Sequence, residues 1–168
     1  MSISMYQASV PVFQQILDSM DAILIKTQSD IETRKLDPQA ILQARLYPNM
    51  FTFTRQVQIA CDFAKGCTAR LAGQDVPAYE DNEASIEELR ARIAKTLAFI
   101  ASVPQTSIDG SEERQINVGS GERARQFTGQ HYLLHYVLPH FYFHATTTYA
   151  ILRHNGVDIG KKDFIGKN

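Results

Sequence analysis

The sequence predicts an all-α protein, a four-helix bundle with a small β-hairpin between the third and fourth helices. Long segments with apolar residues at alternating three- and four-residue spacing predict amphipathic helices of bundle length. Between Pro104 and Thr128 the pattern changes to the alternation of strands around a glycine-rich turn. The chain has 168 residues, enough for one ordinary domain with its own hydrophobic core. We therefore expect residues 1–168 to form a single domain.

Prolines mark where the first two long helices are expected to begin. From Tyr6 to about Ile31 apolar residues recur at helical spacing, and Pro11 lies in the first turns or bends the helix. Asp37-Pro38 predicts a short helical turn, because proline suits the first position of a helix. The second long helix is expected to open at Pro48-Asn49 and to end at Gly73. Its predicted inward face consists of Phe53, Val57, Ala60, Ala64, Cys67 and Leu71.

A capping box predicts the start of the third long helix. Ser85 and Glu88 have the spacing at which each side chain satisfies a free backbone amide of the first turn. The buried stripe predicted for this helix is Ile86, Leu89, Ile93, Leu97 and Ile100.

The hairpin precedes a fourth helix that contains a proline. Gln115–Val118, the turn Gly119-Ser120-Gly121 and Arg123–Phe127 predict two short strands. The turn lacks the Gly-Lys-Ser/Thr of a phosphate-binding loop. Thr128 is expected to cap the fourth helix, which runs to Asn155. Pro139 must kink this helix or be absorbed by a local irregularity, because proline removes one backbone hydrogen bond.

Composition argues against several classes of partner. With 17 basic and 18 acidic residues the chain lacks the basic patch of a nucleic-acid binder. The uncharged segment from Gly129 to Leu152 could span a bilayer, but its histidines, tyrosines and threonines suit a helix buried in protein. The N-terminus lacks the features of a secretory signal, and Cys61 and Cys67 point apart as small core residues of a reducing compartment. We expect a cytoplasmic protein that binds neither nucleic acid nor membrane.

All 5 histidines lie on or at the end of the predicted fourth helix. The pairs His131/His135 and His140/His144 have i,i+4 spacing, which places two imidazoles on one side of a helix where a divalent metal can bridge them. His144 borders the apolar stripe and is the best candidate for an inward-facing group, whereas the first pair lies on the other flank. The stripe itself is Leu133, Val137, Phe141, Ala145, Thr148 and Leu152.

Two histidines alone are a modest signal for a metal, because a metal site needs a third and a fourth ligand. The second long helix has no histidine, and Asp62 is its most plausible oxygen ligand or hydrogen-bond acceptor. A histidine beside a core stripe can equally be a structural residue that is fully hydrogen-bonded.

Four stretches of the sequence resemble a family of bacterial proteins in the DinB/YfiT-like superfamily of metal-dependent helical bundles. They are Ser4–Pro11, Arg55–Lys65, Ala69–Gly73 and Phe141–Phe164. In that superfamily a His-x-x-x-His motif on the last helix, followed by Leu-Arg, supplies two metal ligands, and His140, His144 and Leu152-Arg153 match it. The superfamily's third ligand, a histidine on the second helix, has no counterpart here. The resemblance also implies a homodimer.

Two functions follow as hypotheses. In the first, His140, His144 and Asp62 hold a divalent ion such as Zn, Ni, Mn or Fe, and the protein is an enzyme similar to the superfamily's thiol transferases and small-amide hydrolases, with Tyr136 or Tyr142 as proton donor. In the second, the protein is a non-catalytic dimer that binds a small molecule between its helices. The aromatic residues expected to line that pocket are Phe141, Tyr142, Phe143 and Tyr149.

Overall fold

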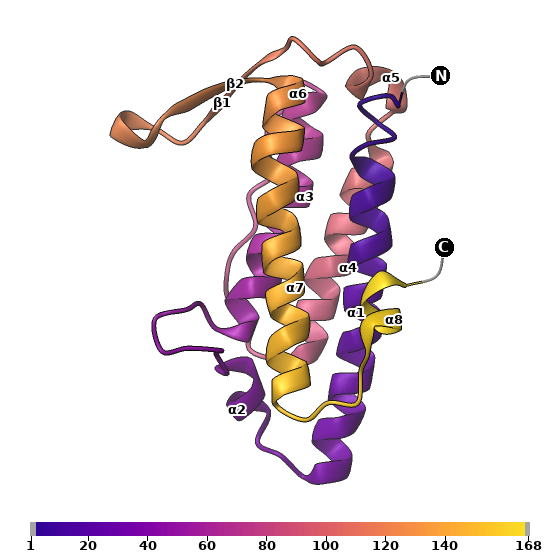
Figure 1. Cartoon of the computed structure of the whole chain (residues 1–168), viewed down its shortest axis with the longest axis vertical. Coiled ribbons are helices and arrows are strands. Elements are labelled where there is room, and N and C mark those ends of the chain that lie inside the picture. The colour runs from indigo at the N-terminus through magenta and orange to yellow at the C-terminus, as the bar shows by residue number, and fades with distance from the viewer. Residues whose placement is uncertain (1–2, 167–168) are drawn as a thin grey trace.

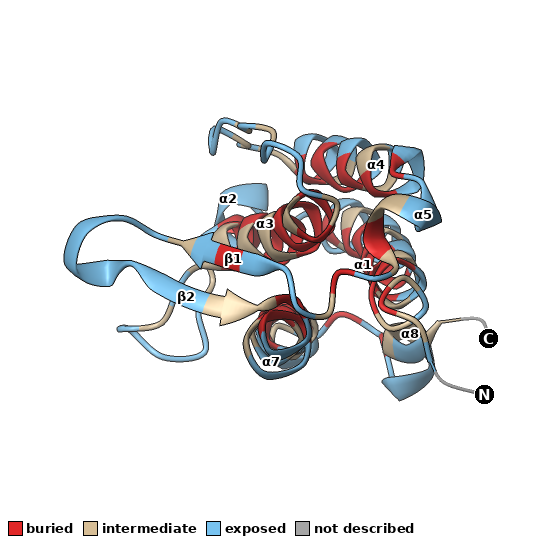
Figure 2. Cartoon of the chain, turned by 90° about the horizontal axis from the view of Figure 1, so that it is seen from above, coloured by how far each residue is buried: buried red, intermediate tan, exposed pale blue. Residues whose placement is uncertain are grey.

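The computed structural model describes residues 3–166, and it shows a four-helix bundle from which a β-hairpin projects at one end (Figure 1). The fold class predicted from the sequence is confirmed. Seen from above, the long helices surround a buried centre (Figure 2). They are α1 (Val10–Arg34), α3 (Phe53–Leu71), α4 (Ile86–Ser102) and a last helix made of α6 (Gly129–His131), the π-helical segment η2 (Tyr132–Val137) and α7 (Leu138–His154).

The starts of α1 and α3 differ from the sequence prediction. The first helix begins at Val10 rather than Tyr6, with Pro11 in its first turn as expected. The prediction that the second long helix opens at Pro48-Asn49 is wrong, because α3 begins at Phe53. The hydroxyl of Thr52 accepts a hydrogen bond from the backbone N–H of Arg55 and caps the helix.

Short helices accompany the long ones, and the last of them along the chain packs against the side of α1 (Figure 1). The predicted turn at Asp37-Pro38 is α2 (Pro38–Leu42), and the Asp37 carboxylate accepts the backbone N–H of Gln39. Two others were not predicted, α5 (Gln105–Ile108) and α8 (Lys161–Ile165). The latter packs on α1, where Lys26 Nζ lies 2.7 Å from an Asp163 carboxylate oxygen.

Helices α3 and α4 run in the same direction, so the chain must return along the bundle between them (Figure 1). Residues 72–85 make this return without a helix or strand of their own. At its start Gly73 adopts φ +70°, and at its end Ser85 caps α4 by accepting the N–H of Glu88. Glu88 in turn accepts the N–H of Ala84 rather than that of Ser85, one residue away from the predicted capping box.

The predicted hairpin consists of β1 (Gln115–Val118) and β2 (Arg125–Thr128), joined through the short helical turn η1 (Gly121–Arg123). The strands are antiparallel, and Ile116, which is buried, pairs with Phe127. Gly119 opens the turn at φ +78°, and a Cβ there would lie 2.8 Å from the carbonyl oxygen of Arg123. The hairpin tip is exposed and extends away from the bundle (Figure 2).

The irregularity expected at Pro139 is the π-helical segment η2, which ends just before this proline. Pro139 lies at the junction of η2 and α7, where the irregular segment accommodates the missing backbone hydrogen bond. Thr128 is the N-cap residue of this helix, as predicted, but its side chain makes no capping hydrogen bond.

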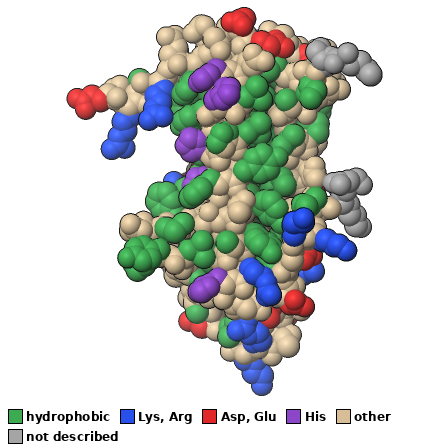
Figure 3. Space-filling view, in the orientation of Figure 1, with side chains coloured by type: hydrophobic (Ala, Val, Ile, Leu, Met, Phe, Trp, Pro, Cys, Tyr) green, Lys and Arg blue, Asp and Glu red, His purple; other side chains and the backbone are tan. Residues whose placement is uncertain are grey.

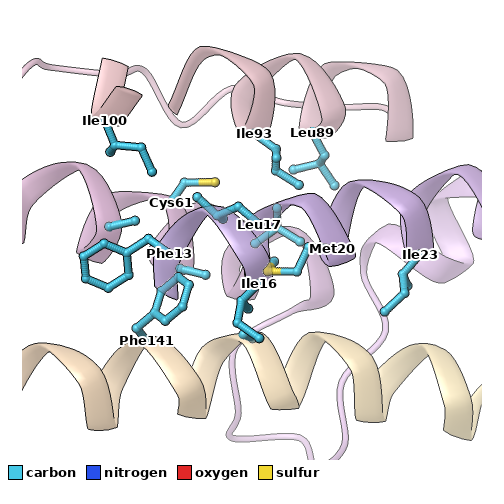
Figure 4. Close-up of a cluster of buried hydrophobic side chains, with 14 of the residues drawn as sticks. Phe13, Ile16, Leu17, Met20, Ile23, Cys61, Leu89, Ile93, Ile100 and Phe141 are labelled. Atoms are coloured by element: carbon cyan, nitrogen blue, oxygen red, sulfur yellow. The ribbon is translucent and has the colours of Figure 1, made fainter. Parts of the chain in front are cut away.

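The core is formed by the inward faces of all the long helices, and its centre is drawn in Figure 4. The stripes predicted for α3 and α7 are buried throughout, and Leu97 alone of the α4 stripe is only partly buried. Cys61 and Cys67 are free thiols within this core, as predicted. Burial raises the pKa of the Cys61 thiol to about 12.

None of the helices in residues 3–166 combines the length and the apolar character needed to cross a membrane.

Candidate functional site

Asp62, the predicted third metal ligand, lies in an ion cluster between α3 and α4. One of its carboxylate oxygens is 2.9 Å from Arg92 Nη2 and 3.0 Å from Lys65 Nζ. Both cations are buried, with side-chain exposures of 2% for Arg92 and 5% for Lys65. Arg92 also binds Glu83 at 2.8 Å and Asp81 at 3.0 Å, so the cluster fastens the returning segment 72–85 to α4.

The side chains of His140 and His144 lie against Phe63, the residue that follows Asp62 on α3. Phe63 stacks on both imidazoles, with ring centroids 4.8 Å from His140 and 6.0 Å from His144. Successive residues of a helix point about 100° apart, so the side chain of Asp62 is directed toward α4 when that of Phe63 meets α7. Within residues 3–166 no group of three or more His, Cys, Asp or Glu side chains is placed to hold a metal. The structure therefore brings His140 and His144 together but not Asp62 with them.

Hydrogen bonds fix the same tautomer in both histidines. The Nδ1 of His140 lies 2.6 Å from the carbonyl oxygen of Tyr136, which can only accept, so this Nδ1 carries the proton. The Nδ1 of His144 lies 2.6 Å from Oε1 of Gln56, whose amide nitrogen donates to Phe51. In the neutral form of each ring the proton is therefore on Nδ1, and Nε2 is the nitrogen that could bind a metal or accept a proton.

The burial of the histidines agrees with the prediction that His144 points inward. His144 is 7% exposed, His140 is partly buried, and His131 and His135 are exposed. Figure 3 shows histidines spaced along the face of the last helix beside a broad area of hydrophobic side chains. The prediction that the first pair lies on the other flank assumed a straight α-helix, whereas η2 includes His135 and separates the two pairs, which changes their relative direction.

Burial lowers the pKa of His144 from 6.5 to about 4, with repulsion from His140 and Arg55 acting in the same direction. In metal-free protein we expect the stability from this neutral imidazole to be fully present above pH 6.5 and to be lost as the pH falls toward about 4. The free energy of unfolding should be about 2 kcal/mol lower at about pH 5 than at about pH 8 from this group alone. Urea denaturation across this range, with a chelator present, measures it.

The matched variants for this experiment are His144→Gln and His135→Gln. Glutamine at position 144 keeps a donor for Gln56 but does not titrate, so most of the pH dependence should disappear. The same change at the exposed His135 should leave it in place. Equal pH dependence in wild type and His144→Gln would show that His144 is not the source of the pH dependence.

A cavity of about 400 Å³ adjoins the histidine pair. Its walls come from α3, the returning segment, the hairpin and η2, and the lining residues are Asp62, Phe63, Lys65, Arg70, Val76, Pro77, Ala78, Tyr79, Val118, Tyr132 and Tyr136. Cavities of similar or larger volume occur elsewhere, for example about 570 Å³ beside α8, but that one has no aromatic residue in its lining. The cavity next to the histidines combines aromatic walls with three charged side chains.

The π-helical segment carries two of the three tyrosines that line this cavity. Tyr132 is buried and its hydroxyl accepts a hydrogen bond from Arg70 at 3.1 Å. Tyr136 packs on His140 with ring centroids 4.5 Å apart, so the cavity wall is continuous with the histidine pair. Short π-helical segments are frequent at functional sites, where they redirect side chains. Tyr136, predicted as a proton donor, thus lies beside the predicted metal ligands, whereas Tyr142 is exposed.

Most of this site was missed by the sequence prediction. The pocket was expected to be lined by Phe141, Tyr142, Phe143 and Tyr149, but none of them lines the cavity. Phe141 is in the core, and Tyr142 and Phe143 point outward. The sequence did contain one signal for this site, a second face of α3 at helical spacing beside its apolar stripe. The residues of that face are buried, and they are Gln58, Cys61, Lys65 and Thr68.

Comparisons with known proteins agree on one relationship. The sequence model of the family described as "Domain of unknown function (DUF1993)" matches residues 5–165. A crystal structure of a DinB family member from Shewanella denitrificans is similar, with a TM-score of 0.89 and 37% sequence identity over 97% of this chain and 92% of the other. A comparison with functionally curated proteins finds no match.

Proposed function

This chain belongs to the DUF1993 family and is DinB-like, and we propose that it binds a small organic molecule in the cavity beside the histidine pair. The observation that supports this is the cavity itself. Its volume of about 400 Å³ suits a compact ligand, and its lining places phenol, ammonium, guanidinium and carboxylate groups around aromatic walls. Rigid elements hold these groups, since α3 and η2 carry most of the lining.

Three naphthalene compounds test this function, one neutral, one anionic and one cationic: 2-naphthylmethanol, naphthalene-2-carboxylate and 2-naphthylmethylamine. We expect at least one of them to bind wild-type protein saturably, with one molecule per chain, in equilibrium dialysis. Val118→Trp places a large ring at the cavity wall and should abolish that binding. Asn117→Trp is the matched control, because neighbouring strand residues point to opposite faces. Binding of none of the three, or equal binding by the two variants, would contradict the proposal.

A divalent metal at His140 and His144 is the second candidate, and one observation favours it. In both residues a carbonyl oxygen holds the Nδ1 proton and leaves Nε2 unprotonated, which is the usual state of a metal-binding histidine. Asp62 is engaged by Arg92 and Lys65, so a metal here would need water or a bound ligand to complete its coordination. Such an ion could lower the pKa of a bound water or thiol, as the enzyme hypothesis requires.

The metal site can be tested by repeating the unfolding measurements on the His144 and His135 variants with added metal. A metal that binds the folded protein raises its free energy of unfolding by mass action. Zn²⁺, Ni²⁺ or Mn²⁺ near neutral pH should therefore stabilise wild type and His135→Gln but not His144→Gln. Stabilisation of all three proteins to the same extent would exclude the pair as the site.

The homodimer implied by the resemblance stays a prediction. The surface on which we propose that a second copy packs is the outer face of the last helix, which carries no charged side chain between Gly129 and Leu152. Leu134, Tyr142 and Phe143 are exposed on it by 40%, 40% and 55%. Exposed apolar area of this kind is typical of interaction surfaces.

A further inference from the structure

The cavity carries more positive than negative charge. Lys65 and Arg70 line it against the single carboxylate of Asp62, and Asp62 is already bound by Lys65 and by Arg92 behind it. Among residues 3–166 Arg70 takes part in no ion pair, and its guanidinium donates a hydrogen bond to the Tyr132 hydroxyl. A guanidinium has five N–H donors, so most of those of Arg70 remain available to a ligand.

Gly66 makes the room in which this guanidinium lies. It is buried in the middle of α3, one turn before Arg70, where glycine is a poor helix former. A Cβ on Gly66 would lie 2.6 Å from Nη1 of Arg70 and 3.9 Å from Val76, which also lines the cavity. Side chains of a helix lean toward its N-terminus, so Arg70 folds back over Gly66 to reach Tyr132. Any larger residue at position 66 would displace it.

Aromatic rings form the part of the cavity wall that adjoins Arg70. The rings of Tyr132 and Tyr136 are nearly parallel, with centroids 5.9 Å apart, and Phe63 meets Tyr136 at the same distance. We propose that the ligand of this cavity has a planar apolar body and a single oxyanion, a carboxylate or a phosphate monoester, that Arg70 binds. This inference rests on the proposed function, since it names the ligand class of the same cavity.

The experiment compares naphthalene-2-carboxylate and 2-naphthyl phosphate with the neutral 2-naphthylmethanol. A charge-assisted bidentate pair with arginine should make the better oxyanion bind at least about tenfold more tightly than the alcohol. Naphthyl fluorescence anisotropy measures the binding, and because the chain has no tryptophan, tyrosine is its main source of overlapping emission. The two anionic compounds separate a carboxylate ligand from a phosphate ligand.

Two variants test the role of Arg70. Arg70→Met should bind the anions no better than the alcohol, while its affinity for the alcohol stays near that of wild type. Gly66→Ala should lose the same preference without loss of stability, because alanine favours the helix and only the mobile end of Arg70 must move. Arg45→Met, a change outside the cavity, is the control and should bind as wild type does.

Equal binding of charged and neutral compounds by wild type, or an anion preference that survives Arg70→Met, overturns the inference and leaves the cavity as a binding site. Failure of all the naphthyl compounds to bind overturns the proposed function together with it. Loss of preference in Gly66→Ala with an unchanged unfolding midpoint supports the inference, since a general loosening of the fold would lower that midpoint.

Discussion

Arg92→Met should lower the free energy of unfolding by about 3 kcal/mol, which is near the lower end for breaking a buried ion pair. The guanidinium is 2% exposed and bridges three carboxylates, those of Asp62, Asp81 and Glu83. Removing it leaves these charges without their shared partner. The loss stays near the lower end because Asp62 and Asp81 are 38% exposed and because the buried Nε of Arg92 has no hydrogen-bond partner to lose among residues 3–166.

The matched control for this prediction is two residues away on the same helix. Arg90 binds Asp21 through Nε at 2.8 Å, but the side chains are 39% and 29% exposed. A pair so open to water contributes less than about 1 kcal/mol, so Arg90→Met should be close to wild type in urea denaturation. A loss of stability in Arg92→Met no larger than that in Arg90→Met would mean that the cluster adds little to the fold.

A second measurement tests whether Arg92 holds the returning segment 72–85 in place. The returning segment has no secondary structure, and Arg92 binds it through Glu83, Asp81 and the carbonyl oxygen of Glu80. In Arg92→Met we expect a glutamate-specific protease to cleave after Glu80 and Glu83 much faster than in wild type. Tyr79 belongs to the same segment and packs against Lys65 at 3.8 Å, so the cavity wall would loosen as well.

The architecture could be read from the sequence because helical periodicity is a local property of long segments. The features that were predicted correctly each depend on a pattern within a short stretch of sequence. They are the position of Pro11, the Asp37-Pro38 turn, the hairpin and the apolar stripe of α7. The start of α3 was placed too early because Pro48 is a stronger sequence signal than the single threonine hydroxyl at Thr52 that caps the helix. Element boundaries depend on such single bonds.

The site was harder to predict because it depends on which faces of different helices meet. Spacing placed His140 and His144 together, since both lie on one helix. It could not show that Phe63 rather than Asp62 would meet them, because that is set by the rotation of α3 against α7. The role of Arg92 was equally hidden, since its carboxylate partners lie on α3 and on a segment with no periodic pattern.

Phe141→Ala should lower the free energy of unfolding by about 3–5 kcal/mol, the range for removing a buried phenylalanine. Phe141 is fully buried and meets Phe13 edge to face, with ring centroids 4.9 Å apart (Figure 4). The loss combines the apolar surface no longer buried with a cavity at the contact between α1 and α7. Urea denaturation measures it, with unfolding followed by circular dichroism because the chain has no tryptophan.

In the monomer, at protein concentrations too low for the proposed dimer, Phe143→Ala is the control on the same helix. It should change stability there by less than about 0.5 kcal/mol because its ring is 55% exposed. A cycle of Phe13→Leu, Phe141→Leu and the double variant should give a coupling of about 0.5–1.5 kcal/mol for the aromatic contact. A Phe141→Ala loss no larger than that of Phe143→Ala would mean that the two faces of α7 are packed alike. In that case the apolar stripe would not be what fixes the rotation of this helix, and the inward direction of His144 would need another cause.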